Sequence, residues 1–230
     1  MTTEGLAANP RQPAADRPAQ FRYGIVFLLM LALVVFVIAA PSADWSRAAT
    51  LTIEGVALVF AVATGRERQQ VRRRRALGVG VVMIVLIILV ATGAAPRQLT
   101  DTANVLVTVA IPVVIVGGVL RLLRERGATL QAVAGALAIY LAVGLVFAWI
   151  IGLIAHVDST LYFAQHTNGT EGDRVYFSFT VLTTTGFGDF SAATPAGHAL
   201  AVIEELTGQL YLVTVIGLLI GNFVGRQKTT

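Results

Sequence analysis

The sequence has no cysteine among its 230 residues, and only 13% of them are charged, against roughly 25% in soluble domains. The lack of cysteine excludes disulfides, iron–sulfur clusters and thiolate zinc sites, and it leaves the redox compartment open. The scarcity of charge, together with a hydrophobic share of 56%, excludes a water-soluble domain built around a single core.

Six stretches of the chain carry little or no charge and are long enough to cross a membrane. About 20 helical residues span a hydrocarbon core that is ~30 Å thick. The six stretches are residues 23–40, 47–65, 76–95, 102–120, 130–156 and 195–225. We therefore predict an all-α membrane protein with six transmembrane helices.

The basic residues predict how these helices are oriented. All but three of the 17 Lys and Arg residues fall in alternate connections, the exceptions being Arg47, Arg97 and Arg174. Because basic residues in short loops stay cytoplasmic, we expect a multi-pass protein of the cell membrane with both termini in the cytoplasm. The basic run within residues 66–75 is also compatible with nucleic-acid binding. Orientation and contact with anionic lipid headgroups explain it better, so we expect the bilayer, and no nucleic acid, as its partner.

The pattern divides the chain into four parts. Residues 1–21 are Pro-rich and polar, which predicts a disordered cytoplasmic tail. A cleaved signal peptide is the alternative, although the apolar run after Arg22 is longer than usual for one. Residues 22–127 are expected to form four transmembrane helices, and the fourth lacks the regularly spaced arginines of a voltage sensor. Residues 128–226 form the predicted pore domain, and residues 227–230 form a cytoplasmic end.

The segment DRVYFSFTVLTTTGFGDF, residues 173–190, differs from all the others. Asp173 is suited to cap a short helix over residues 175–183, which reaches only ~14 Å and so enters the membrane without crossing it. Residues 184–188 must then leave as irregular backbone. Hydrocarbon tolerates such backbone only where protein encloses it or where it lines a watery path. We therefore predict a re-entrant pore loop between the fifth and sixth helices.

The residues of this loop indicate what the path carries. Gly186 and Gly188 can adopt positive φ, which would turn backbone carbonyls toward a common axis, where they replace the water shell of a cation. Thr184 adds a hydroxyl oxygen at the inner end, and the C-terminus of the short helix adds partial negative charge. Asp189 would lie at the outer mouth and concentrate cations there.

The stretch TTTGFGD, residues 183–189, resembles the selectivity filter of potassium channels. Residues 135–150 and 205–221 resemble the outer and inner helices of small bacterial potassium channels, so the chain is similar to the bacterial six-transmembrane potassium channel family. The chain holds one GFG segment, whereas a pore needs several such segments around an axis, so the resemblance implies a homotetramer. The same resemblance implies that the channel has no organic cofactor. It also implies that K⁺ is coordinated by the backbone carbonyls of Thr184, Thr185, Gly186, Phe187 and Gly188, and by the Thr184 hydroxyl.

Two residues depart from the family pattern. Thr185 stands where valine or isoleucine is usual, and Phe187 lacks the phenol that a tyrosine would use to brace the filter. A weakly selective monovalent cation channel is therefore the alternative, and a non-conducting scaffold or carrier that keeps the pore-loop fold is another. A membrane hydrolase fits poorly, because the three histidines lack metal-binding spacing and no GxSxG motif occurs. We do not expect an enzyme.

Glycines in the last helix indicate possible places of movement or close packing. Gly208 lies ~19 Å along the helix, near mid-membrane, where a glycine resembles the family's gating hinge. Close helix packing is the alternative at this position. Gly217, Gly221 and Gly225 repeat every four residues, a spacing typical of packing.

Three carboxyl groups fall inside predicted membrane helices, where they are costly and suggest function. Adjacent Glu204 and Glu205 point about 100° apart on a helix, so only one can face a given target. We expect one of them to brace the short pore helix or the filter from behind, as a hydrogen-bonding partner of Thr183 or of the backbone. A neutral carboxyl buried between helices is the equal alternative. The sequence suggests no partner for Glu54.

Overall fold

The computed structural model describes residues 22–64, 69–92, 94, 97–127, 129–157, 160–219 and 221. The predicted tail at residues 1–21 and the end at residues 227–230 lie outside these ranges, as do Arg66 and Gly225. Apart from two isolated bridges from Phe163, to Thr167 and Ala192, the ordered elements of the described residues are helices.

The helices follow the predicted order along the chain. They are α1 (Arg22–Ala39), α2 (Asp44–Thr64), α3 (Gln69–Ala91), α4 (Arg97–Arg126), α5 (Leu130–Val157), α6 (Glu171–Leu182) and α7 (Pro195–Tyr211), which continues through a π-helical turn, η2 (Leu212–Ile216). Four helical spans are long and apolar enough to cross a membrane: those in α2, α4 and α5, and the span Pro195–Leu219. Two shorter apolar stretches, Tyr23–Ala39 and Leu77–Ala91, belong to α1 and α3. The described part of the chain is therefore helical, and its apolar spans are those of a membrane protein.

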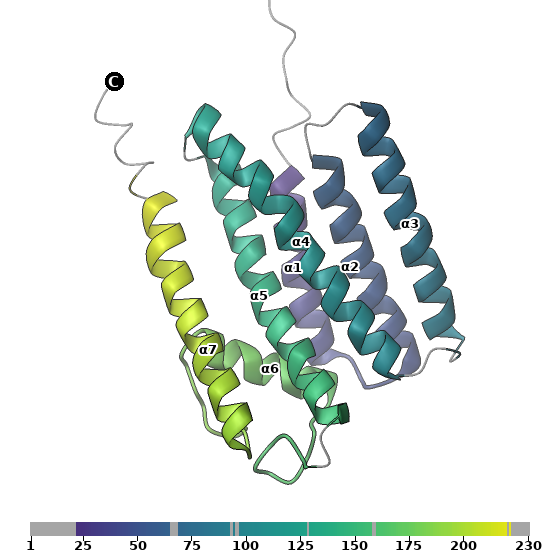
Figure 1. Cartoon of the computed structure of the whole chain (residues 1–230), viewed down its shortest axis with the longest axis vertical. Coiled ribbons are helices and arrows are strands. Elements are labelled where there is room, and N and C mark those ends of the chain that lie inside the picture. Colours follow the sequence, from purple (N-terminus) through teal and green to yellow (C-terminus); the bar gives the residue numbers. More distant parts are fainter. Residues whose placement is uncertain are drawn as a thin grey trace, which may run out of the picture.

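Five helices, α1 to α5, run along the length of a bundle, with α3 at one edge against α2 and α7 at the other edge (Figure 1). The short α6 occupies only the lower part of this view, where it packs against α1, α5 and α7. Its 12 residues correspond to roughly 18 Å, less than the thickness of a hydrocarbon core.

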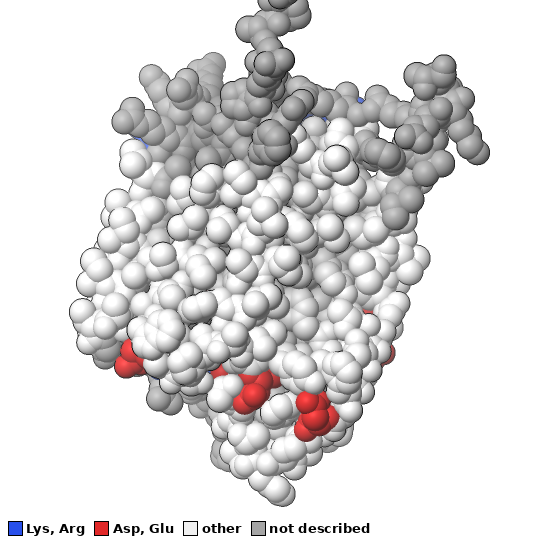
Figure 2. Space-filling view, turned by 180° about the vertical axis from the view of Figure 1, so that it is seen from behind, with Lys and Arg blue, Asp and Glu red and all other residues white. Residues whose placement is uncertain are grey.

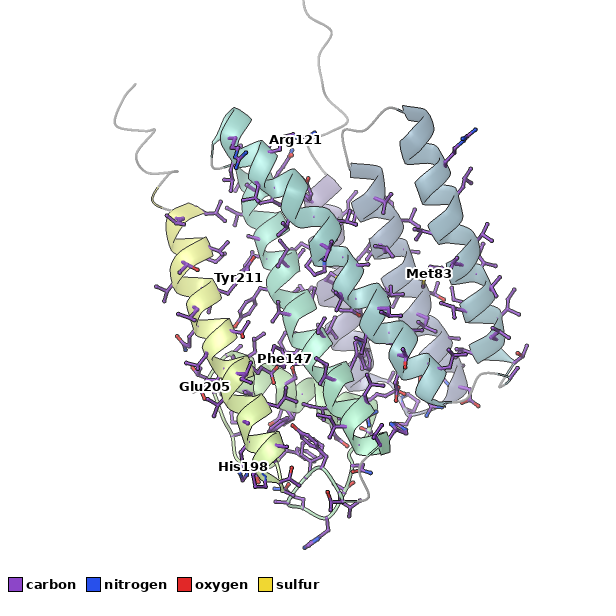
Figure 3. The ribbon with its side chains drawn as sticks, viewed as in Figure 1. Met83, Arg121, Phe147, His198, Glu205 and Tyr211 are labelled. Carbon is purple, nitrogen blue, oxygen red and sulfur yellow. The ribbon has the colours of Figure 1, made fainter. Side chains whose placement is uncertain are left out.

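The two ends of the bundle differ in their loops and charges. α5 ends and α7 begins at the lower end in Figure 1, which also carries the segments on either side of α6 and which we call the loop end. Acidic side chains gather toward this end (Figure 2). His198 lies at the loop end, whereas Arg121 lies at the opposite end (Figure 3). The short helix α6 and the segments before and after it, which the sequence predicts as the pore loop, thus lie at one end of the bundle.

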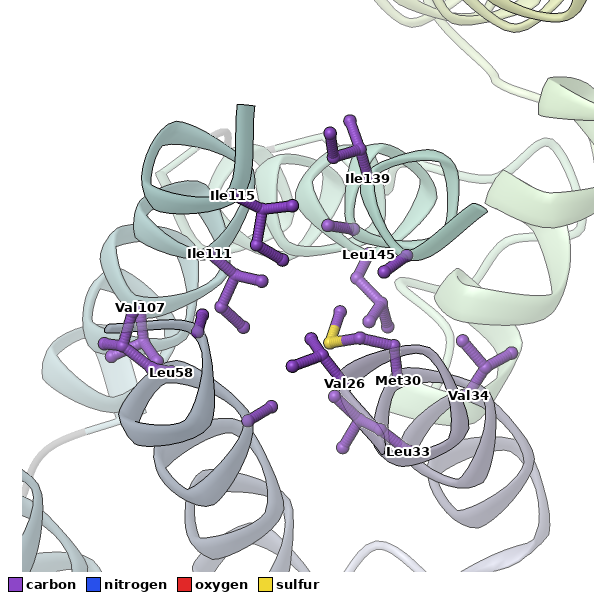
Figure 4. Packing of buried hydrophobic residues seen from close by; sticks show 14 of the residues in the cluster. Val26, Met30, Leu33, Val34, Leu58, Val107, Ile111, Ile115, Ile139 and Leu145 are labelled. Atoms are coloured by element: carbon purple, nitrogen blue, oxygen red, sulfur yellow. The ribbon is translucent and has the colours of Figure 1, made fainter. Parts of the chain in front are cut away.

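The interior of the bundle is formed by α1, α2, α4 and α5. In the close view, Met30 of α1 lies near Leu145 of α5, and Leu58 of α2 lies near Val107 of α4 (Figure 4). Exposed aliphatic side chains cover the outer surface of α3, including Leu77, Val81, Val82 and Ile84. In a membrane such a surface meets lipid, so the helices associate mainly through the close fit of the interior.

Candidate functional site: α6 and the segment that follows it

α6 begins with a capping box one turn earlier than predicted. The hydroxyl of Thr170 accepts a hydrogen bond from the Asp173 backbone N–H (3.1 Å), and the Asp173 carboxylate accepts one from the Thr170 N–H (2.7 Å). The prediction of Asp173 as the N-cap is therefore wrong in position. Thr170 is the N-cap and Asp173 is the third helical residue, because the threonine and the acid satisfy each other's backbone N–H.

The segment after α6 alternates between two backbone conformations. φ is +57° at Thr184, +53° at Gly186 and +82° at Gly188. The predicted positive φ of both glycines is confirmed, whereas that of Thr184 was missed because threonine rarely adopts it. A β-branched residue in this region is strained by about 1–3 kcal/mol, and such strain is concentrated at functional sites.

The N–H groups of this segment are bound back to α6. Thr185 N and Gly186 N both donate to the carbonyl oxygen of Thr180, at 2.8 and 3.1 Å, and Thr184 N donates to that of Val181 at 2.8 Å. These bonds use the carbonyls that a helix leaves unpaired at its C-terminus. They hold the segment against the negative end of the α6 dipole.

The threonine hydroxyls at the start of the segment have different partners. The Thr183 hydroxyl donates to the Phe179 carbonyl (2.6 Å) and lies 2.9 Å from the Thr185 hydroxyl. The Thr184 hydroxyl accepts a hydrogen bond from the side-chain amide of Gln209 in α7 (3.0 Å). Gln209 was missed by the sequence analysis, although it directly follows Gly208. A hydroxyl oxygen has a second lone pair, so this bond leaves Thr184 able to coordinate a cation.

The ring of Phe187 packs against the phenol ring of Tyr176. Phe187 is 68% exposed, yet its ring stacks on Tyr176 of α6, with centroids 6.2 Å apart and planes within 4°. A hydrogen bond to Asp189 raises the pKa of the Tyr176 phenol. Phe190 packs edge-on against Tyr176 and against Phe163. The structure thus places a phenol beside the segment from the short helix instead of from the segment itself.

Adjacent Glu204 and Glu205 lie in different surroundings, as the helix geometry predicts. Glu204 is fully buried, whereas Glu205 is exposed on the single chain (Figure 3). The partner of Glu204 is Ser178 of α6, so Glu204 contacts the short helix as expected, but through Ser178 and not through Thr183. Thr183 lies five residues beyond Ser178, as the C-cap of α6, and its hydroxyl contacts Phe179 of α6 and Thr185 of the following segment.

The contacts of Ser178 indicate the protonation state of Glu204. The serine oxygen lies within hydrogen-bonding distance of Oε1 of Glu204 and 2.6 Å from the carbonyl oxygen of Gly144 in α5. A hydroxyl has one proton, so it cannot donate to both oxygens. Both contacts are satisfied when the carboxyl carries a proton and donates to Ser178, which then donates to Gly144. This favours the neutral buried carboxyl.

Gly208 is the point where α7 approaches the end of α6. A Cβ at this position would overlap the carbonyl oxygen of Leu182 and lie 3.0 Å from its Cδ1. Close packing therefore requires this glycine, and the π-helical turn η2 begins four residues later. At Gly217 and Gly221, a Cβ would meet no described atom of the same chain within 4 Å, so close packing at these glycines stays a prediction for contacts between chains.

Glu54 has partners on two other helices, which the sequence could not suggest. Its Oε1 accepts hydrogen bonds from the Thr108 hydroxyl of α4 (2.8 Å) and from the indole N–H of Trp149 in α5 (3.2 Å). Both donors are buried, as is Glu54 itself. This carboxyl joins α2 and α4 to α5, the outer helix of the predicted pore domain.

The described residues contain no group of three His, Asp or Glu side chains that could hold a metal ion. The ring of His156 bonds to Gly152 of its own helix, and that of His198 bonds to the carbonyl of Ala192. These histidines have local structural contacts at the ends of α5 and α7.

Residues 135–224 match a family model described as "Ion channel". The matched region runs from α5 through α6 and the following segment into α7, so it contains the whole site described above. Proteins of this family are ion channels and not enzymes. No curated protein and no solved structure matches the chain. The match supports an ion channel in the membrane.

Proposed function

We propose that four copies of the chain form a channel through which K⁺ crosses the cell membrane passively. The observation that carries the proposal is the alternation of φ at Thr184, Gly186 and Gly188 directly after α6. In a regular strand successive carbonyls point to opposite sides, whereas alternating signs of φ bring them to the same side. A row of carbonyl oxygens is what a dehydrated cation needs in place of its water shell.

In this proposal K⁺ passes along residues 184–188. The backbone carbonyls of these residues and the hydroxyl of Thr184 supply the oxygens, and the C-terminal end of α6 adds partial negative charge. Asp189 attracts cations at the outer mouth. Glu204 and Ser178 support the segment from behind, since Ser178 lies in α6 and Glu204 in α7.

Exposure of the segment on a single chain supports an assembly of several chains. Thr183 and all the residues up to Asp189 are exposed, although backbone at membrane depth has to be enclosed by protein or water. α7 and the following turn η2 also present an uncovered apolar face, with one residue each turn. This face comprises Ile203, Leu206, Leu210 and Val213. Fourfold cyclic symmetry would bring these faces and the segments around one axis.

The remaining parts of the proposal concern the membrane arrangement. α1 and α3 cross together with the four longer helices, and the loop end faces outward, so that both termini are cytoplasmic. α1 to α4, within residues 22–127, form a domain without an arginine-type voltage sensor, since Asp101 is the single charged residue between Leu99 and Leu120 of α4. Gly208 is the bending point of the inner helix, next to η2.

The test is flux into liposomes that contain the purified protein and a potassium gradient. We expect barium-blocked flux that Gly186→Ala abolishes, because alanine is strained at φ +53°. Gly78→Ala in α3 is the matched control and keeps the flux, since a Cβ there meets no described atom within 4 Å. Absence of flux under every condition would favour a non-conducting scaffold.

Selectivity is tested in the same liposomes. Preference for rubidium over sodium supports a potassium channel. Equal flux of both ions would indicate a weakly selective cation pore. This is the alternative that follows from Thr185 and Phe187, which depart from the family pattern. Chemical cross-linking to a ladder that ends at four chains tests the stoichiometry separately from conduction.

A further inference from the structure

A cavity of about 310 Å³ opens at the loop end between the first helices and the predicted pore domain. Arg47 of α2 and Asp101 of α4 line one side, and His156 of α5 with Glu171 and Arg174 of α6 line the other. The volume lies at the lower end of the range for pockets that hold small molecules. None of these side chains belongs to the conduction path proposed above.

Two buried polar atoms at this cavity have no hydrogen-bond partner in the described part of the chain: Nε of Arg174 and Oδ2 of Asp101. The residues are only 6% and 5% exposed. One is a donor without an acceptor, and the other is an acceptor without a donor. Native proteins leave few such groups, and each one calls for a bound water, an ion or a ligand.

His156 does not supply the donor that Asp101 lacks. Its Nδ1 lies 3.1 Å from Oδ2 of Asp101 but 2.7 Å from the carbonyl oxygen of Gly152. Both oxygens are acceptors, and Nδ1 carries at most one proton. The shorter contact to Gly152 uses it, so Asp101 still needs an N–H or O–H donor from elsewhere.

Arg174 likewise still needs an acceptor. Its guanidinium lies against Gly152, where a Cβ would come within 3.4 Å of Cζ and Nε. Oε1 of Glu171 is taken by Arg47 (2.7 Å), whose Nη1 also binds Asp44 (2.9 Å). Burial lowers the pKa of Arg174, and the carboxylates of Asp101 and Glu171 oppose this shift. Arginine stays charged in proteins, so an added anionic oxygen would stabilise it.

The charges of the cavity narrow the choice of ligand. Two guanidinium groups, Arg47 and Arg174, face two carboxylates, Asp101 and Glu171, so the lining is formally balanced. A ligand of one sign would be repelled by half of the lining. A ligand that carries both signs meets both unpaired atoms.

We propose that this cavity binds a small zwitterion, whose anionic oxygen accepts a hydrogen bond from Arg174 and whose ammonium group donates one to Asp101. The ligand belongs to the chemical class that free amino acids share with the ethanolamine phosphate headgroup of lipids. It would touch α4 and α6 together and so connect the first helices to the start of the short helix. This inference does not depend on which ion the channel conducts.

The first experiment measures binding by calorimetry to the full chain in phosphatidylcholine nanodiscs. We expect glycine to bind and glycine betaine to bind at least about tenfold more weakly, because its trimethylammonium group has no N–H for Asp101. Acetate and methylammonium each carry half of the ligand and should also bind at least about tenfold more weakly. Equal binding of glycine and betaine would overturn the proposal.

Variants locate the site. Asp101→Asn should weaken glycine binding at least about tenfold. Asp44→Asn is the matched control and should leave binding unchanged, because that carboxylate is exposed and does not line the cavity. Arg174→Gln should also lose glycine binding. If this variant does not fold, the result for Asp101→Asn alone tests the site. Unchanged glycine binding in Asp101→Asn, with unchanged elution and thermal midpoint, would disprove the site.

A second experiment, with lipids, distinguishes a lipid headgroup from a free amino acid as the ligand. Phosphatidylethanolamine has ammonium N–H groups, whereas phosphatidylcholine has none. If a lipid headgroup is the ligand, native mass spectrometry should show that the chain retains phosphatidylethanolamine in preference to phosphatidylcholine. The Asp101→Asn variant should lose this preference. Glycine binding without lipid preference identifies the free amino-acid class. If neither glycine nor phosphatidylethanolamine binds, water alone fills the cavity and the proposal fails.

Discussion

The interior between α1, α2, α4 and α5 is complete within one chain, whereas α7 and the segment after α6 are not. In the former, large aliphatic side chains and the carboxyl of Glu54 are fully buried among the chain's own helices. In the latter, the side of α7 that carries Gly197, Glu204, Gly208 and Tyr211 packs on the chain, whereas Ile203, Leu206 and Leu210 on the opposite side are exposed. This difference is what we expect if α1, α2, α4 and α5 form a self-contained support and if other copies complete the pore, as proposed above.

The two buried carboxyls show the same difference on a smaller scale. Glu54 accepts from two donors, Thr108 and Trp149, on two helices, so its contacts fit a charged or a neutral group. Glu204 has one partner, Ser178, and the proton arrangement there favours the neutral form. The first carboxyl holds helices together, whereas the second lies beside the short helix that precedes the proposed conducting segment.

The largest effect should follow Gly208→Ala. The added methyl group would overlap the Leu182 carbonyl, a backbone atom that cannot move without displacing the end of α6. We expect flux in liposomes to fall to the level of empty vesicles while the helical signal in circular dichroism is retained. Gly217→Ala is the control, since no described atom lies within 4 Å of its new methyl group. Normal flux in Gly208→Ala would show that α7 does not pack on α6 as described.

Glu54→Ala should cost about 2–4 kcal/mol of stability, because it leaves a cavity and two buried donors without an acceptor. Glu54→Gln keeps an acceptor oxygen and should lose much less. The thermal midpoint in detergent measures both changes. The ratio of rubidium to sodium flux should not change in either variant, since Glu54 lies in the self-contained part. A lowered ratio in Glu54→Gln would break the comparison of the two regions.

Ser178→Ala should lower the ratio of rubidium to sodium flux several-fold, with a loss of about 1–3 kcal/mol from the unpaired carboxyl. Glu204→Ala should act in the same direction. Glu204→Gln should keep the ratio, because an amide can donate to Ser178 as the protonated carboxyl does. If Glu204→Gln behaves like Glu204→Ala, the neutral form of Glu204 is excluded.

The smallest effect is expected at the start of α6. Thr170→Ala removes one half of the capping box and should cost about 1 kcal/mol, which corresponds to roughly fivefold faster hydrogen exchange in the first turn of α6. Thr52→Ala in α2 is the control, since that exposed hydroxyl bonds only to the carbonyl of Ala48 in its own helix. Unchanged exchange in Thr170→Ala would mean that the cap contributes nothing to α6.

Local features of the chain could be predicted because neighbouring residues determine them. The apolar runs place all six long helices within a few residues of their observed positions, apart from the earlier start of α3 and the longer α4. The positive φ of Gly186 and Gly188 follows from the absence of a Cβ. The opposite surroundings of Glu204 and Glu205 follow from the 100° turn between successive helical residues. Each of these needs only geometry within one element.

What depends on residues far apart in the chain was decided by the tertiary structure. Glu54 meets Trp149 across 95 positions, and Tyr211 donates to the Ala136 carbonyl across 75. Glu204 bonds to Ser178 and not to Thr183, because the turn of α6 that contains Ser178 faces α7. No periodicity reports which faces of different helices meet. The cavity that joins Arg174 to Asp101 has the same origin, since packing of separate helices places their polar groups around a common space.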